Sequence, residues 1–257
     1  MRLNLNADLG ESFGAWNMGD DASLLQHVDS ANVACGFHAG DPLVMSQTLV
    51  MARQQGTSVG AHPSFPDLQG FGRRQMSLND ADVRSIMLYQ LSALQGMARV
   101  HAVDMTHVKP HGAINNMACE DAHLAAIITR AVHEFDPSLI FLAPVLSELE
   151  KAAQQAGLRT AREIFADRAY TDNGSLVPRS QPGAVLKSAS ECIEHVRAMI
   201  RKGGVVTLSG KVLPVEFHSI CVHGDNAHAV ETARRIREAL VTDEHELLTL
   251  PDLLVDQ

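Results

Sequence analysis

The sequence predicts a single α/β domain in which seven parallel strands form a barrel surrounded by helices. Short apolar runs typical of strands alternate with amphipathic stretches typical of helices. Ionisable residues stand at the carboxyl ends of these runs, and the chain has no G-x-G-x-x-G turn of a dinucleotide-binding open sheet. With 257 residues, 46% of them hydrophobic, the chain has a length at which α/β barrels occur as one domain, here 1–257.

The predicted strands are short, and the first of them has two interpretations. Residues 3–8 alternate leucine and alanine with asparagine and aspartate, which fits a half-exposed antiparallel strand or a barrel strand whose polar face lines the mouth. The later strands favour the barrel because they also end in ionisable residues. The predicted strands span residues 3–8, 30–35, 57–62, 106–111, 139–144, 159–165 and 219–224.

Helical patterns with start and stop signals lie between most of these strands. Asp41 and Pro42 open a helix that ends at Gly56, and Ser77 with Asp80 predicts the cap of a long helix. The segment 205–217 breaks the alternation and predicts a hairpin inserted before the last strand. The predicted helices span residues 42–55, 78–102, 120–135, 144–156, 186–202 and 225–240.

Composition argues against several classes of function. The net charge of −9 disfavours binding to nucleic acids or anionic membranes, which requires a basic face. The four cysteines are widely spaced and form no C-x-x-C pair, as expected of a protein in a reducing compartment. The first residues lack the apolar region of a signal peptide, and no apolar run approaches the roughly 20 residues of a membrane span. These features predict a cytoplasmic protein.

Groups capable of chemistry follow almost every predicted strand. The active site of a β/α barrel lies at the carboxyl ends of its strands, so these side chains are expected to form one ring. They are Asp8, Cys35 with His38, His62, Lys109 with His111, Glu163, and His223 with Asp225.

Several residues in or next to this ring also have a simple structural interpretation. Asp41 and Asp225 each precede a predicted helix, so capping is the leading explanation for both. Asp8 could be a turn aspartate that binds its own backbone. His38 lies in GFHAG, where the glycines let the backbone approach a ligand and the following helix start suits an anionic group. We therefore favour a functional role for His38.

The segment around Pro110 indicates where a strand ends and which side chains face inward. Proline is disfavoured inside an interior strand, whereas Lys109 and His111, two residues apart, are expected to point into the barrel. A buried lysine beside histidines is expected to have a lowered pKa and to seek a carboxylate or an anionic substrate. Asp8, His62 and His111 would together provide an Asp-His-His metal site with open positions.

Three arginines stand out in predicted loops of this acidic chain. Arg73 and Arg74 in GFGRRQ, and Arg168 in FADRAY, could bind a carboxylate or phosphate through two hydrogen bonds, although surface salt bridges would also account for them. The chain has no P-loop motif, so a nucleotide would have to bind without one. It also has no G-x-S-x-G motif, which argues against a serine hydrolase.

Six long motifs give the chain a resemblance to a known family. Their sequence and order resemble the LamB/YcsF family over nearly the whole length. Members often have cysteine where this chain has Ala7, a position predicted to face outward and away from the chemistry. The motifs are LNLNADLGESFG (3–14), SANVACGFHAGDP (30–42), GAHPSFPDLQGFGRR (60–74), VKPHGA (108–113), EIFADRAYTDNGSLVPR (163–179) and ICVHGD (220–225).

The resemblance implies a fold, an activity and partners. The fold would be a seven-stranded β/α barrel of the glycoside hydrolase and deacetylase type. The activity would be the ATP-dependent opening of 5-oxo-L-proline to L-glutamate, with magnesium-bound ATP as co-substrate and two further subunits, B and C. Related barrels imply a divalent metal held by Asp8, His62 and His111. The alternatives are a stand-alone, metal-dependent, deacetylase-like hydrolase of carbohydrates or amides, and a non-catalytic barrel that docks other subunits.

Two sets of candidate residues result. Asp8 is expected to act as general base or metal ligand, and His62 and His111 as acids or ligands. Lys109 and Arg74 are expected to neutralise a carboxylate or phosphate. The catalytic candidates are Asp8, Glu11, His38, His62, Lys109 and His111. The candidates for binding substrate or phosphate are Asn6, Arg73, Arg74, Glu163, Arg168, His223 and Asp225.

Overall fold

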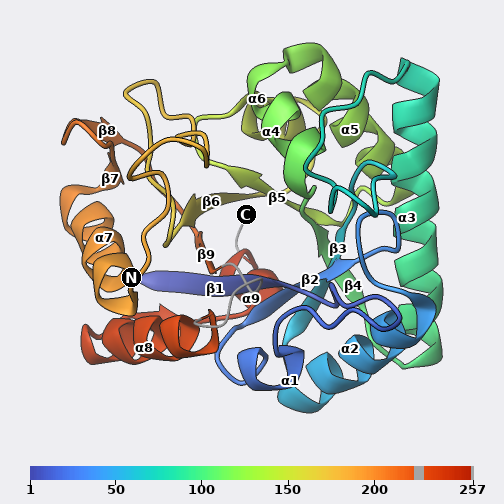
Figure 1. Cartoon of the computed structure of the whole chain (residues 1–257), viewed down its shortest axis with the longest axis horizontal. Helices are drawn as coiled ribbons and strands as arrows, with labels where there is room; N and C mark the ends of the chain where they lie inside the picture. The colour runs from blue at the N-terminus through green and yellow to red at the C-terminus, as the bar shows by residue number, and fades with distance from the viewer. Residues whose placement is uncertain (223–228, 256–257) are drawn as a thin grey trace.

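A computed structural model describes residues 1–222 and 229–255 and contains the predicted parallel barrel (Figure 1). Each barrel strand pairs in parallel with the next, and the last pairs with both the sixth and the first, which closes the ring. The prediction of a seven-stranded α/β barrel is therefore confirmed. The barrel strands are β1 (Arg2–Leu9), β2 (Ser30–Ala34), β3 (Ser58–His62), β4 (Met105–Val108), β5 (Ile140–Pro144), β6 (Thr160–Phe165) and β9 (Ser219–Val222).

Helices form the outer layer around these strands (Figure 1). The six predicted helices occur, with ends that differ by a few residues; the cap of the long third helix is Asn79 rather than Ser77, because Asn79 accepts a hydrogen bond from the Asp82 N–H. Residues 225–228, the predicted start of the last helix, lie outside the described residues. These helices are α2 (Pro42–Gln55), α3 (Asp80–Val100), α5 (Ala122–Phe135), α6 (Glu148–Gln155), α7 (Ala189–Lys202) and α8 (Ala229–Thr242).

Several short elements were not predicted from the sequence, whereas the inserted hairpin was. Strands β7 (Gly204–Val206) and β8 (Val212–Pro214) pair in antiparallel fashion, which confirms the hairpin. The additional elements are α1 (Asp21–Leu24), α4 (Gly112–Glu120), β10 (Glu246–Leu247) and α9 (Leu250–Leu253).

The last elements of the chain pack at the amino end of the barrel. At the amino end, β10 pairs with the start of β1, and Leu250 and Leu254 of the α9 region pack on Ile140 and Leu142 of β5. The first strand is buried on both faces and paired in parallel on both edges, so the barrel interpretation is correct and the half-exposed antiparallel one is wrong. Its asparagines point into the barrel because the leucines of the opposite face pack against the helices.

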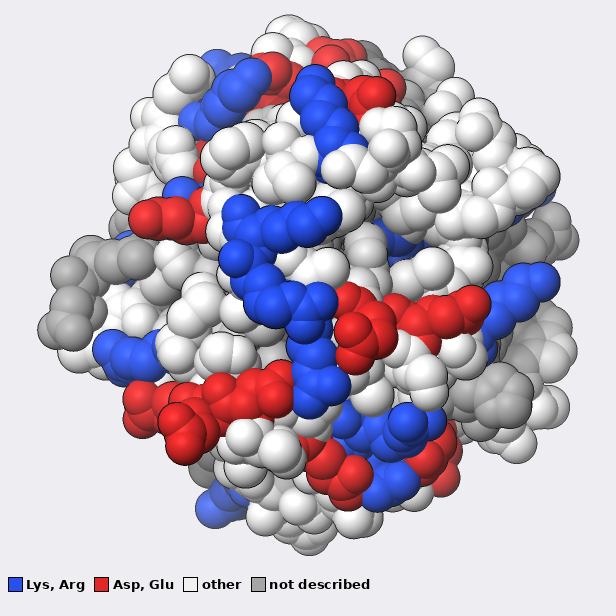
Figure 2. All heavy atoms as spheres, turned by 90° about the vertical axis from the view of Figure 1, so that its left-hand side faces the viewer, with Lys and Arg blue, Asp and Glu red and all other residues white. Residues whose placement is uncertain are grey.

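Charged side chains of both signs lie side by side on the face that is turned toward the viewer in Figure 2, with uncharged surface between them. Ion pairs account for part of this pattern: Arg197 contacts Asp243 at 2.7 Å, and Arg234 contacts Glu231 at 2.8 Å. Among the described residues, no helix has the length and apolar character required to cross a membrane.

Candidate functional site

The carboxyl end of the barrel holds a buried cluster of one carboxylate and three histidines. Glu11 follows β1, His38 follows β2, His62 ends β3 and His111 follows β4. All four side chains are buried, and one potential ligand atom of each lies within 4.8 Å of the others. Asp8 of β1 adjoins this group, with its Oδ2 atom 3.3 Å from His62 Nε2.

Glycines allow the loops that carry these side chains to approach one another closely. Gly40 has a φ of +79°, and a Cβ atom there would lie 2.7 Å from the carbonyl oxygen of Gly10. Gly72 has a φ of +65°, and a Cβ atom there would lie 2.8 Å from His38 Cβ. Asp41 caps α2, as predicted, by accepting hydrogen bonds from two N–H groups of its first turn. Together these features fix His38 beneath the 70–75 loop.

Backbone carbonyls determine which ring nitrogen carries the hydrogen in two of the histidines. His62 Nδ1 lies 2.6 Å from the Lys109 carbonyl, and His111 Nε2 lies 2.9 Å from the Phe71 carbonyl, so both of these nitrogens are donors. The remaining atoms, His62 Nε2 and His111 Nδ1, then present lone pairs to each other at 2.9 Å. Two facing acceptors need a proton or a cation between them.

Burial makes that proton costly. The pKa values of His38 and His111 lie well below 6.5, first because burial disfavours the charged ring and then because neighbouring histidines repel it. The rings of His38 and His111 stack with centroids 3.8 Å apart, and His38 Nδ1 is buried with no hydrogen-bond partner in the described structure. These features fit a site for a divalent cation.

Lys109 is a fixed positive charge beneath the cluster. Its Nζ atom lies 3.0 Å from Asp8 Oδ1 and 3.1 Å from Glu163 Oε1, and its side chain is almost fully buried. Burial by itself lowers the pKa of Lys109, but the nearby carboxylates outweigh that effect and raise it well above 10.5. The predicted lowering of this pKa is therefore wrong, because the sequence could not show that two carboxylates surround the amine.

A polar network below Lys109 was only partly predicted. Asn6 donates a hydrogen bond to Glu163 Oε1 at 2.9 Å, and both residues are fully buried and absent from the walls of the neighbouring cavity. Asn32 donates to Asp8 Oδ1 at 3.0 Å, and His107 Nε2 lies 3.1 Å from Asn32 Oδ1. Asn32 and His107 were not predicted, although polar residues within apolar strands were a usable signal.

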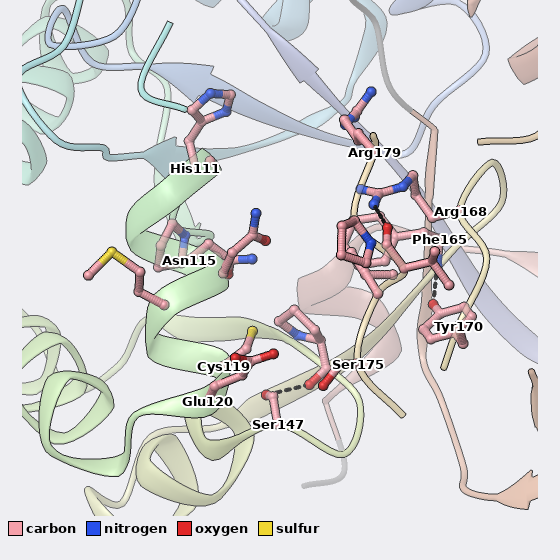
Figure 3. Close-up of a pocket in the computed structure, with 18 of the residues that line it drawn as sticks. His111, Asn115, Cys119, Glu120, Ser147, Phe165, Arg168, Tyr170, Ser175 and Arg179 are labelled. Atoms are coloured by element: carbon pink, nitrogen blue, oxygen red, sulfur yellow. Dashed lines mark hydrogen bonds between the residues drawn. The ribbon is translucent and has the colours of Figure 1, made fainter. Parts of the chain in front are cut away.

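A cavity of about 630 Å³ opens beside the cluster (Figure 3). Asp8, His62, Lys109 and His111 line one part of it. Figure 3 shows His111, Asn115 and Cys119 along α4 on one side, with Arg168 and Arg179 on the other. Arg73, a predicted substrate-binding residue, also lines the cavity, whereas Asn115, Cys119 and Arg179 were missed.

The remaining predicted binding residues differ in their placement. Arg168 is buried, donates a hydrogen bond to the Val177 carbonyl at 2.7 Å, and has a pKa lowered to about 10 by burial and by Arg179. Arg74 is 63% exposed, forms an ion pair with Asp67 and does not line the cavity, as expected of the surface salt bridge considered as the alternative. The predicted binding residues His223 and Asp225 lie outside the described residues.

Known proteins similar to this chain match it over almost its full length. The A subunit of 5-oxoprolinase from Azoarcus sp. is 57% identical over 253 residues, covering 98% of this chain and 99% of that protein. The A subunit of 5-oxoprolinase from Rhodopseudomonas palustris is 48% identical over 241 residues, covering 93% of this chain and 95% of that protein.

Solved structures match as well. The crystal structure of a lactam utilization protein from Thermus thermophilus superposes with a TM-score of 0.92 at 40% identity, covering 97% of this chain and 100% of that one. The catalytic domain of a peptidoglycan N-acetylglucosamine deacetylase from Eubacterium rectale shares the fold alone, with a TM-score of 0.53 and 11% identity over 96% of this chain and 87% of that one. The LamB/YcsF family model matches residues 3–254, and the chain therefore belongs to the LamB/YcsF family.

Proposed function

We propose that this chain opens the lactam ring of 5-oxo-L-proline to give L-glutamate, as the A subunit of an ATP-dependent 5-oxoprolinase. One observation carries the proposal: a buried set of carboxylates, histidines and a lysine faces a cavity with arginines in its wall. Relatives at up to 57% identity are named as the A subunit of 5-oxoprolinase, which supports this substrate. The proposal includes two further subunits, B and C, and ATP as its magnesium complex.

The reaction needs activation because an amide is stabilised by resonance. Transfer of the terminal phosphoryl group of ATP to the lactam oxygen would give an imidate phosphate and ADP. Water would then add to the activated carbon, the ring C–N bond would break and the nitrogen would take up a proton, which leaves an acyl phosphate. A second water would attack this acyl phosphate and release phosphate, leaving the new carboxylate. The protein must supply a base for the water, an acid for the nitrogen and positive charge for the developing oxyanion.

The described contacts suggest a role for each group. Asp8 Oδ1 is held by Lys109 and Asn32, which leaves Oδ2 beside His62 and suited to accept a proton from water. The Nε2–H of His111 is bound by the Phe71 carbonyl, so Asp8, once it has taken a proton from water, is the group suited to pass that proton to the leaving nitrogen. Lys109 forms an ion pair with Asp8 and adds positive charge to the cavity wall.

We also propose that the cluster holds a divalent metal. Glu11, His38, His62 and His111 provide three imidazoles and one carboxylate, a donor set suited to zinc or iron. The sequence predicted Asp8, His62 and His111 as the metal ligands. We propose instead that Glu11 and His38 join the two histidines as ligands and that Asp8 lies beside the cluster. The backbone carbonyls that accept from His62 and His111 resemble the second-layer partners typical of metal-bound histidines. Such a metal, when bound, would polarise a carbonyl or lower the pKa of a bound water.

The cluster also favours a second candidate function. A metal-dependent hydrolase of amide or carbohydrate substrates would need the same histidines but no ATP. The two functions differ in one measurable property, because only the 5-oxoprolinase requires ATP for turnover.

The decisive experiment combines the purified chain with its two partner subunits, 5-oxo-L-proline and ATP, and measures glutamate release. We expect release only when all components are present, and a loss on the order of 10²–10³-fold in Asp8→Asn. The exposed variant Glu216→Gln serves as the matched control and should retain full activity. The absence of glutamate in every combination would refute the proposed activity, and an Asp8→Asn rate within a few-fold of wild type would exclude Asp8 from the chemistry.

A further inference from the structure

Asn115 presents a buried hydrogen-bond acceptor to the cavity that nothing in the described structure satisfies. Its side chain lies on α4 one helical turn after His111, and Cys119 follows one turn later, so the three residues form a stripe along the cavity wall (Figure 3). Asn115 is only 6% exposed, and its Oδ1 atom has no partner among the described residues. Because buried polar atoms are rarely left unpaired, this atom points to a ligand that donates a hydrogen bond.

The opposite wall of the cavity carries positive charge. Arg168 and Arg179 lie across the cavity from Asn115 (Figure 3), and Arg73 also contributes to the lining. Arg168 is 6% exposed, and no carboxylate of the described residues lies within ion-pair distance of it. Among the described residues, its side chain donates hydrogen bonds only to the carbonyls of Val177 and Ala184. Asp167 is close enough to act on the charge of Arg168 but forms no ion pair with it among the described contacts. A buried guanidinium whose hydrogen bonds go to carbonyls, with other arginines nearby, favours an anionic ligand.

We propose that Asn115 and Arg168 recognise a cyclic amide that carries a carboxylate on the carbon next to its ring nitrogen. Asn115 Oδ1 accepts a hydrogen bond from the ring N–H, and Arg168 binds the carboxylate. This inference rests on the proposed function and extends it, because it assigns the residues that distinguish a lactam from other rings of the same size.

The N–H contact is testable with a ligand that lacks this donor. The γ-lactone analogue of 5-oxo-L-proline keeps the carboxylate and the carbonyl but has a ring oxygen in place of the N–H. We expect the wild-type chain to bind the lactam at least about tenfold more tightly than the lactone, because two acceptors would otherwise face each other in a buried site. Asn115→Ala should bind the lactam about tenfold more weakly and lose this preference. Isothermal titration of the purified chain measures both affinities.

Asn116→Ala is the matched control, because Asn116 lies on the same helix and lines the same cavity but has an exposed side chain. It should keep the preference for the lactam. The carboxylate contact is tested with the carboxamide of 5-oxoproline, which should bind the wild type at least about tenfold more weakly than the acid. Arg168→Gln should bind the acid and the carboxamide with similar affinity. The carboxamide measurement on wild type needs no variant, so the test does not depend on the folding of Arg168→Gln.

The outcomes separate this inference from the proposed function. If the wild type prefers the lactam and Asn115→Ala keeps that preference, the role of Asn115 is refuted while the function stands. If the acid and carboxamide bind the wild type equally well, the role of Arg168 is refuted. If the wild-type chain binds none of these ligands, the assignment of a lactam to this cavity fails, and the inference fails with it.

Discussion

Replacing Lys109 by methionine should destabilise the protein strongly, and by an amount that depends on pH. Lys109 is 3% exposed and lies 3.0 Å from Asp8 Oδ1 and 3.1 Å from Glu163 Oε1. With an effective dielectric constant near 20, each contact corresponds to an attraction of about 5 kcal/mol before the cost of burying the ions. Removing one partner of a buried ion pair typically costs about 3–5 kcal/mol, and we expect that loss at pH 7.

The pH dependence follows from Glu163. Burial raises the pKa of Glu163, and Lys109 opposes that rise. In Lys109→Met the opposing charge is gone, so the pKa of Glu163 in the folded state lies further above its value in the unfolded chain. Between those two values the folded state binds more protons, so the free energy of unfolding of the variant falls as pH rises. The difference from wild type should be smallest near pH 4.5, the ordinary value for glutamate, and larger at pH 7.

Urea unfolding followed by circular dichroism at several pH values measures these free energies. Adding Glu163→Gln to Lys109→Met should recover part of the loss and flatten its pH dependence, because the unpaired buried carboxylate is removed. The control is Lys151→Met, which breaks an ion pair with Glu148 at a side chain that is 59% exposed and should cost below about 0.5 kcal/mol. A loss below about 1 kcal/mol, or one that does not change with pH, would refute this account of Lys109.

Three further predictions test the metal cluster, the barrel interior and the loop arginines. The purified chain should bind zinc, measured by dialysis followed by metal analysis, and His38→Ala should weaken that binding at least about tenfold. The control variant His123→Ala, at an exposed histidine, should bind zinc like the wild type. Equal zinc content in the two variants would contradict the cluster. Gly60→Ala should lower the free energy of unfolding by about 1–3 kcal/mol in urea, because the new Cβ atom would lie 2.2 Å from the buried His107 ring. An unchanged urea midpoint of unfolding would show that the ring moves without cost. Arg74→Gln should leave glutamate release by the complex within about twofold of wild type, since Arg74 contacts Asp67 outside the cavity, and a large loss would show that the loop arginines act together.

The ring at the carboxyl ends could be predicted because parallel strands in a barrel end on the same side. That rule alone was enough to place His38, His62 and His111 together with Asp8 beside them, although no two of them are close in sequence. The pKa of Lys109 could not be predicted in the same way. Its direction depends on two carboxylates from other strands, and only the register of the closed barrel brings them to the amine.

Asn115 was missed for a local reason. Residues 110–112 read Pro-His-Gly, a pattern typical of a turn, and the prediction of the next helix started at residue 120. In the structure Gly112 adopts a φ of +65° at the start of α4, so a helix begins directly after His111. The glycine that argued against a helix is the residue that allows it to start there, and the helix then carries Asn115 to the cavity.

The polar interior of the barrel explains why the first strand had two interpretations. Alternation of asparagine with leucine usually indicates that one face of a strand meets water, yet Asn4 and Asn6 are fully buried. Asn6 donates to Glu163 of β6 and accepts from Asn32 of β2, so its side chain crosses the barrel between strands. Glu163 in turn contacts Lys109, and Lys109 holds Asp8. The position of the carboxylate beside the histidines is thus tied to the register of the strands, a constraint that an apolar interior would not supply.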